Sequence, residues 1–201
     1  MSVETVMTRI AEINGMLAPP RAQAAEQAAT MTFDTALTKA GAAPAMAPLG
    51  WNAAGGNAGQ RMLAAAQAEV GQAEQPPGSN DSPRIAEYRT ATAGSGVGPW
   101  CAYFVSWAAK QAGAPVGEQG QGFGAVSAVM DWGQRTGRAL PAGSTPQAGD
   151  VIVWGGRHIG IVENVLPDGR IQTIEGNSSD QVSRRTYGPD GGGATGYVRL
   201  G

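Results

Sequence analysis

Residues 99–113 read PWCAYFVSWAAKQAG, and this stretch is the most clearly helical part of the chain. Pro99 suits the first turn of a helix, and Gly113 suits the stop at its C-terminal end. One apolar stripe follows the helical spacing i, i+4, i+7 and i+11, and it consists of Cys101, Val105, Ala108 and Ala112. The pattern therefore predicts a helix over 100–112 with Cys101 at its N-terminal end, on the side that faces the core or a cleft.

In the C-terminal part of the chain the pattern changes from helical to strand-like. Residues 151–154 (VIVW) form a short apolar run, and residues 158–165 and 170–177 flank the sequence Leu-Pro-Asp-Gly, which indicates a hairpin. The segments 182–187 and 196–200 are two further strand candidates. Helices followed by an antiparallel sheet predict an α+β fold.

The part of the chain before the cysteine divides into a leader and the start of a domain. Residues 3–17 place apolar side chains at helical spacing, and an Ala-, Gly- and Pro-rich stretch follows them. From residue 60 onward the sequence predicts helices over 60–70 and 84–90. We therefore expect a partly disordered helical leader and linker over 1–59 and one domain over 60–201.

Composition excludes several classes of function. The chain has 201 residues with 31 glycines and 13 prolines, about a fifth of the total, so much of it forms turns and loops. A net charge of −2 with few lysines argues against a nucleic-acid partner. We find no run of apolar residues long enough to span a membrane and no apolar core of an ordinary secretory signal. One cysteine and one histidine exclude an internal disulfide and a Cys/His zinc cluster.

Cys101 and His158 are the candidates for nucleophilic chemistry. A helix N-terminus stabilises a thiolate through its free N–H groups, and an imidazole at the start of a strand can act as the base. Each residue also has a structural interpretation, because a lone cysteine is most often a small buried apolar residue and a lone histidine is most often a surface or hydrogen-bonded one. Residue chemistry alone leaves the two interpretations about equally supported.

The imidazole also needs an acceptor for its second ring nitrogen. Glu175 and Asn177 lie two residues apart on a predicted strand, so their side chains share one face. If Val165 pairs with Arg170 across a four-residue loop, His158 faces Asn177 and has Glu175 diagonally opposite. A slip of one residue would place these groups on opposite faces, so the prediction depends on the register.

Three blocks of sequence resemble the CHAP domain, the cysteine, histidine-dependent amidohydrolase/peptidase family. They occur in the family's order and are residues 99–113, 146–165 (PQAGDVIVWGGRHIGIVENV) and 171–180 (IQTIEGNSSD). Residues 78–89 (GSNDSPRIAEYR) also resemble the segment before the nucleophile in many bacterial members. The resemblance covers about 60–201. It implies a papain-like fold, with N-terminal helices packed on a small antiparallel sheet, and hydrolysis of amide bonds in peptidoglycan.

The resemblance also implies roles for individual residues. Cys101 is the nucleophile, His158 is the general base and then the general acid, Glu175 orients the imidazole, and Asn177 is a supporting or alternative orienter. Papain-like enzymes often have a glutamine before the nucleophile, but this chain has Trp100, so only the backbone N–H of Cys101 is assigned to the oxyanion hole. Members that bind calcium carry acidic residues before the cysteine, and this chain has none there, so we expect no metal and no cofactor.

Three aromatic residues are candidates for contact with the substrate: Trp100, Phe123 and Trp154. Trp154 lies just before the histidine hairpin and has an equally supported interpretation as a core residue. Phe123 belongs to the Gly-rich segment 117–137, which together with Trp132 is expected to form a loop at the edge of the cleft.

The leader has a resemblance of its own. Residues 3–17 (VETVMTRIAEINGML) and 33–37 (FDTAL) resemble the leaders of actinobacterial proteins associated with flagellar operons. This implies action at the bacterial cell wall without a classical signal, export through the flagellar apparatus, and contacts of residues 1–40 with flagellar rod or export components. A phage-type lysin and a non-catalytic scaffold that retains the fold are the alternatives. Amidase and endopeptidase activity both remain open.

Overall fold

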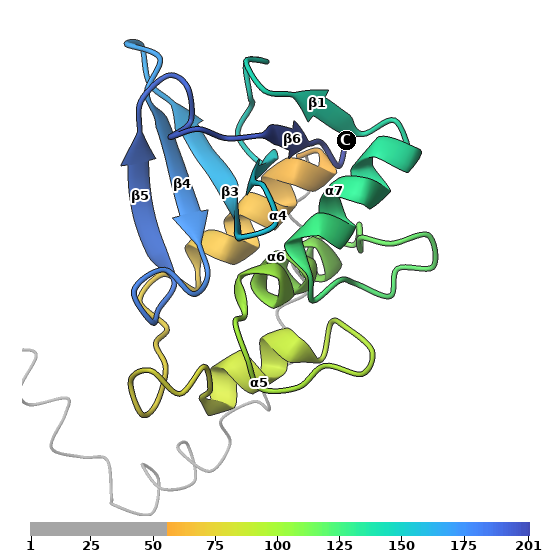
Figure 1. The fold of residues 1–201 in the computed structure, drawn as a ribbon, viewed down its shortest axis with the longest axis vertical. Coiled ribbons are helices and arrows are strands. Elements are labelled where there is room, and N and C mark those ends of the chain that lie inside the picture. The colour runs from red at the N-terminus through yellow and green to blue at the C-terminus, as the bar shows by residue number, and fades with distance from the viewer. Residues whose placement is uncertain (1–55) are drawn as a thin grey trace, which may run out of the picture. The chain divides into compact units, whose positions relative to one another are not determined.

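A computed structural model describes residues 56–201 of the chain (Figure 1). The helices of this part are α4 (Ala58–Gln67), α5 (Pro83–Arg89), α6 (Cys101–Gln111) and α7 (Val126–Arg135). Its strands are β1 (Ala139–Pro141), β2 (Val151–Trp154), β3 (His158–Val165), β4 (Ile171–Glu175), β5 (Ser183–Tyr187) and β6 (Gly196–Val198). The predicted α+β class is confirmed. The predicted leader over 1–59 lies almost entirely outside the described residues.

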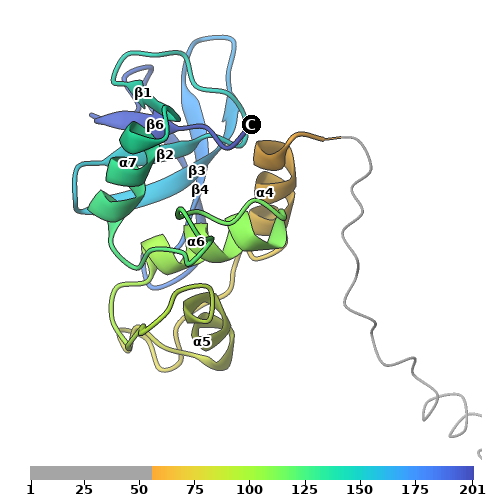
Figure 2. The same cartoon turned by 90° about the vertical axis from the view of Figure 1, so that its right-hand side faces the viewer.

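The six strands form one antiparallel sheet with the order β1-β6-β2-β3-β4-β5. Helices α4 and α6 lie against one face of it, and α5 packs on α6 farther from the sheet (Figures 1 and 2). Alternate strand residues face this helical layer and bury a large core: Val151, Val153, Ile159, Ile161, Ile174 and Val198. The helical layer therefore holds the start of α6 against the central strands.

The other face of the sheet buries a second, smaller core. Its members are Ile152, Trp154, Val162, Ile171, Ala194 and Tyr197, with Leu140, Val165 and Tyr187 packed at its edge. The chain between β5 and β6 covers part of this face, since the indole N–H of Trp154 donates to the carbonyl oxygen of Gly191 over 2.8 Å. The sheet is thus buried on both faces at its centre, which explains why β2 is apolar at every position.

The expectation of a loop over 117–137 was wrong for its second half. Residues 126–135 form helix α7, which buries Val126, Val129 and Trp132 on its inner side. Gly133 lets this helix approach β6, because a Cβ atom there would lie 2.8 Å from a methyl group of Val198. The buried apolar residues of α7 recur every three positions, but the glycines before the helix indicated a loop, so the helix was not predicted.

The β3–β4 hairpin differs in detail from the predicted pairing. The pair is Val165 with Ile171, because Leu166 and Arg170 close a three-residue loop that ends on Gly169 with a φ of 83°. A bulge between Val162 and Asn164 then shifts the register by one residue. Beyond the bulge, toward His158, the strands continue in the predicted register.

Among the described residues, no helix is long and apolar enough to cross a membrane.

Candidate active site

Cys101 is the first residue of α6, and its backbone surroundings differ from those of the preceding helices. Helices α4 and α5 are capped by the side chains of Asn57 and Ser82. The residue before Cys101 is Trp100, whose side chain makes no capping hydrogen bond. The first N–H groups of α6 therefore have no side-chain partner, and these are the groups that stabilise a negative charge. Cys101 itself is 6% exposed.

His158 is the first residue of β3 and lies near both other members of the predicted set. Its Nε2 atom lies 2.8 Å from Oε2 of Glu175, and Cys101 is close enough to the ring to raise its pKa. Because Nε2 is engaged by the carboxylate, Nδ1 is the atom left for the thiol. Burial alone would lower the pKa of His158, but the hydrogen bonds and charges of Cys101 and Glu175 outweigh it and raise this pKa to about 9.

Glu175 is the last residue of β4 and is 1% exposed. Its second carboxylate oxygen accepts a hydrogen bond of 2.6 Å from the hydroxyl of Thr173. Burial alone would raise the pKa of Glu175, but hydrogen bonds from His158, Thr173 and Tyr187 reverse this and lower it. A buried carboxylate held in its charged form beside an imidazole orients the ring and stabilises its protonated state.

Thr173 and Tyr187 were not singled out in the sequence, yet both support the carboxylate. Thr173 lies two residues before Glu175 on the same strand, so strand alternation was the available signal. Tyr187 comes from β5, where it pairs with Ile171, and only the register between β4 and β5 reveals it.

Gly160 makes the close approach of the two strands possible. A Cβ atom at this position would lie 2.7 Å from Cγ of Glu175. The side chain of Glu175 therefore fills the space above Gly160.

Asn177 is not brought to the imidazole. Strand β4 ends at Glu175, and Asn177 follows in a turn with a φ of 56°. Its side-chain amide contacts Oδ1 of Asn80 over 3.5 Å. The structure therefore places Glu175, and not Asn177, at the second nitrogen of His158.

The three aromatic residues predicted to contact substrate have different surroundings. Trp100 is fully buried and donates its indole N–H to Glu74 over 2.9 Å, so the structure contradicts its predicted place in the substrate groove. Phe123 packs near Trp132 at a ring distance of 6.5 Å, its backbone is hydrogen-bonded to the hydroxyl of Ser106, and it is not among the residues that line the cleft beside His158. Sequence alone predicts Trp100 to contact substrate because of its position next to Cys101, and it does not reveal that the side chain is buried.

Trp154 lies beside the imidazole. Its ring stacks on that of His158 at 5.5 Å with an angle of 23° between the planes. A cleft of about 380 Å³ opens here, and its lining consists of Trp154, Arg157, His158, Tyr187 and Gly192. Trp154 is thus mostly buried and also forms a wall of the cleft, so both interpretations of this residue describe part of it.

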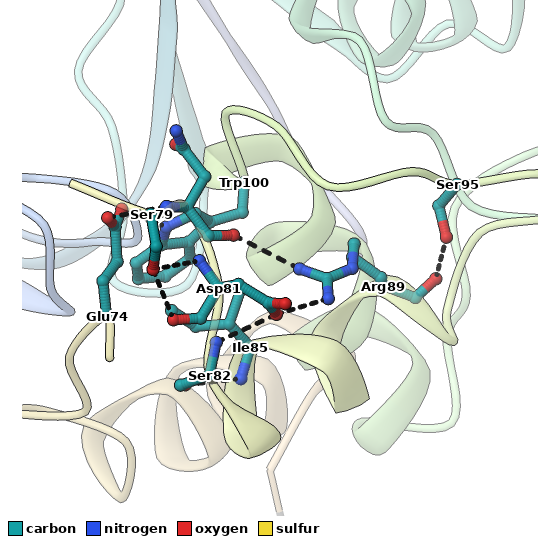
Figure 3. A network of polar contacts seen from close by, with 9 residues as sticks. Glu74, Ser79, Asp81, Ser82, Ile85, Arg89, Ser95 and Trp100 are labelled. Atoms are coloured by element: carbon teal, nitrogen blue, oxygen red, sulfur yellow. Dashed lines mark hydrogen bonds and ion pairs between the residues drawn. The ribbon is translucent and has the colours of Figure 1, made fainter. Parts of the chain in front are cut away.

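A buried polar network connects the segment before α5 with the start of α6 (Figure 3). Glu74 is 3% exposed, and its two carboxylate oxygens accept from the indole of Trp100 and from the backbone N–H of Asn80, over 2.9 and 2.8 Å. Arg89 donates to the carboxylate of Asp81 and to the carbonyl oxygen of Asn80. The network thereby fixes the residue next to Cys101 to the rest of the fold.

A protein family and a solved structure resemble parts of this chain. Residues 92–177 match the family model described as the CHAP domain. No curated protein matched the sequence. A crystal structure of an N-acetylmuramoyl-L-alanine amidase from Staphylococcus aureus is similar with a TM-score of 0.39 and 21% identity. That similarity covers 55% of this chain, and this chain spans about a third of that one, 34%.

The matched residues contain the cysteine at the start of α6, the histidine at the start of β3 and the acid at the end of β4. The match to the CHAP domain model covers less than half of the chain and includes all three of these residues.

Proposed function

We propose that this chain is a cysteine-dependent hydrolase that cleaves an amide bond of bacterial peptidoglycan. The observation that carries the proposal is the position of His158, which hydrogen-bonds the buried carboxylate of Glu175 and lies close enough to Cys101 for the two groups to interact. The match of residues 92–177 to the CHAP domain model supports the choice of peptidoglycan as the substrate. A helix N-terminus behind the sulfur supports the choice of Cys101 as the nucleophile.

The proposed reaction begins with a thiolate–imidazolium pair. The sulfur of Cys101 attacks the carbonyl carbon of the amide, and the carbonyl oxygen takes the negative charge. The uncapped N–H groups at the start of α6, that of Cys101 among them, stabilise this oxyanion. His158 then gives its proton to the amide nitrogen, the C–N bond breaks, and the amine leaves an acyl-enzyme.

The second half of the reaction releases the acid. Neutral His158 takes a proton from a water molecule, and the resulting hydroxide attacks the thioester carbon. The C–S bond breaks, the carboxylic acid departs, and the thiolate–imidazolium pair forms again. Throughout both halves, Glu175 holds the ring with Nε2 toward itself and Nδ1 toward the sulfur, and it stabilises the protonated imidazole.

The test is mass spectrometry of fragments released from purified peptidoglycan of several wall types. We expect the full-length protein to release fragments and the Cys101→Ala variant to release none while its circular dichroism stays unchanged. Newly formed termini distinguish an amidase, which cuts the muramoyl–L-alanine bond, from an endopeptidase. If the folded protein releases nothing from any wall type, the hydrolase proposal is wrong and a scaffold with the CHAP fold replaces it.

A role in opening the wall for the flagellar rod is a further part of the proposal. It rests on the resemblance of residues 1–40 to flagellar leaders, and those residues lie outside the described part of the chain. Its test is whether rod or export components of a flagellum bind the full-length protein and fail to bind residues 56–201. Equal binding by both forms, or by neither, would leave the phage-type lysin as the better account of the chain's origin.

A further inference from the structure

Two aromatic side chains, Trp154 and Tyr187, line the cleft beside His158, which we call the slot. The rings of Trp154 and Tyr187 meet at 5.1 Å with an angle of 50° between them. The chain opposite consists of glycines, and a Cβ atom on Gly192 would lie 2.5 Å from the ring of Tyr187. A side chain at that position would displace the ring that forms one wall. The slot therefore depends on the absence of a side chain at Gly192, and the imidazole of His158 is part of its lining.

Arg157 lines this slot, and hydrogen bonds fix the backbone of the turn that contains it. It belongs to the tight turn between β2 and β3, where its N–H donates to the carbonyl oxygen of Trp154 over 3.3 Å. The same turn is fixed by the N–H of Gly155, which donates to the hydroxyl of Thr195 over 2.9 Å. The guanidinium is exposed and lines the cleft next to His158.

This guanidinium differs from every other one in residues 56–201. Six arginines there are paired with carboxylates, namely Arg84, Arg89, Arg135, Arg170, Arg184 and Arg199. Three more donate to carbonyl or hydroxyl oxygens, namely Arg61, Arg138 and Arg185. In this part of the chain, Arg157 alone has neither an ion pair nor a side-chain hydrogen bond. A charged group without a partner at the mouth of a cleft is available to a ligand.

Cationic side chains lie near the slot. The acid beside it, Glu175, is buried and paired with His158. Asp190 accepts from the N–H of Gly192 over 3.1 Å. Burial and Glu175 raise the pKa of Tyr187, while the charges of Arg185 and Arg157 oppose that rise, so both cations act on the wall of the slot.

We propose that the cleft beside His158 takes a peptide that carries a free carboxylate, and that Arg157 is the residue that binds this carboxylate. The proposal rests on the proposed function, because it names the substrate chemistry of the same site. A guanidinium matches a carboxylate with two parallel N–H groups, which gives orientation as well as affinity. Stem peptides of peptidoglycan occur with their carboxyl groups free or converted to carboxamides, so Arg157 selects between two natural forms of the wall.

The test uses one pair of probes and two variants. The probes are an N-acetylmuramoyl tetrapeptide with free carboxyl groups and the same peptide with the carboxyl groups as carboxamides. The variant is Arg157→Gln, and the matched control is Arg170→Gln, which removes an exposed arginine from the loop between β3 and β4. We expect the unmodified protein and the control to favour the free carboxylate through KM by about tenfold or more, and Arg157→Gln to lose this preference with kcat little changed.

Binding to the inactive protein separates this inference from the proposed function. Titration calorimetry on Cys101→Ala and on Cys101→Ala/Arg157→Gln measures the affinity of both probes without turnover. If the first variant binds the free carboxylate better and the second does not, the inference stands even where no probe is cleaved. If Cys101→Ala binds neither probe, or if removal of Arg157 leaves the preference intact, the inference is overturned whether or not the wall is hydrolysed.

Discussion

Substitution of Glu175 by glutamine tests the electrostatics of the site most directly. The chain contains a single histidine, so NMR of a ¹³C-labelled imidazole gives one signal that reports the titration of His158 alone. Its pKa is raised to about 9 from an ordinary value of 6.5 because the hydrogen bonds to Cys101 and Glu175 outweigh burial. Removal of the negative charge removes one of those two supports, while glutamine keeps the size of the side chain.

The expected change in the pKa of His158 follows from the contributions of its two partners, Cys101 and Glu175. Each contributes a hydrogen bond and a charge, so we expect Glu175→Gln to lower the midpoint by about one pH unit or more. Cys101→Ala removes the other support and should lower it by a similar amount. The alkaline limb of kcat/KM depends on protonated His158, so it should move down together with the NMR midpoint in Glu175→Gln. The rate itself should fall about 100-fold or more, because the imidazolium loses its counter-charge.

Glu163→Gln is the matched control, since it removes a carboxylate from the same strand as His158 that pairs with Arg184 instead. It should leave the midpoint of His158 where it is in the unmodified protein. A midpoint near 6.5 in the unmodified protein would refute the proposed coupling. So would a midpoint that stays the same after Glu175→Gln, because the carboxylate would then contribute nothing to the charge on the ring.

Three further predictions follow from the same geometry. Gly160→Ala forces Glu175 aside and should cost about 1–3 kcal/mol in urea unfolding together with most of the activity, whereas Gly156→Ala, where a Cβ atom meets nothing within 4 Å, should cost neither. Glu74→Gln places an amide N–H against one of the two N–H donors, which are the indole of Trp100 and the backbone of Asn80. It should lower the free energy of unfolding by about 1–3 kcal/mol and slow the alkylation of Cys101 by iodoacetamide. Glu87→Gln, at an exposed position, should do neither. The stabilising contribution of His158 is fully present below about pH 6.5 and is lost as the pH rises through about 9, so the stability difference between the unmodified protein and His158→Ala should shrink by up to about 3 kcal/mol between pH 6 and pH 10. Urea unfolding at several pH values measures it, and a difference that is constant or grows with pH would contradict the sign.

Much of the fold could be predicted because its elements carry strong local signals. The strands 151–154 and 158–165 have the predicted bounds, and the helix that begins with Cys101 differs from its prediction by one residue at each end. Helix α7 was missed because it lies in a Gly-rich segment that indicates a loop. Local periodicity thus identifies helices between clear start and stop signals and fails where glycines surround the helix.

The three central residues of the site could be proposed from the sequence, but the residues that hold them in place could not. Cys101, His158 and Glu175 could be proposed from residue type, helix position and resemblance. The burial of Trp100 against Glu74 could not, because the acid that receives its indole lies 26 residues away along the chain. The contribution of Tyr187 to Glu175 likewise depends on a strand register between β4 and β5 that no local pattern specifies.

The bulge in β3 shows how closely the chemistry depends on register. With the three-residue loop that closes the hairpin, an unbroken ladder from the pair Val165–Ile171 would place Ile161 opposite Glu175. His158 would then lie on the face opposite to that of the acid, since strand residues alternate. The extra residue between Val162 and Asn164 shifts the ladder so that Ile161 pairs with Ile174. His158 and Glu175 thereby share one face, and Val165 still reaches the smaller core. A single unpaired residue thus allows a tight hairpin loop and a histidine–carboxylate pair to coexist in the same two strands.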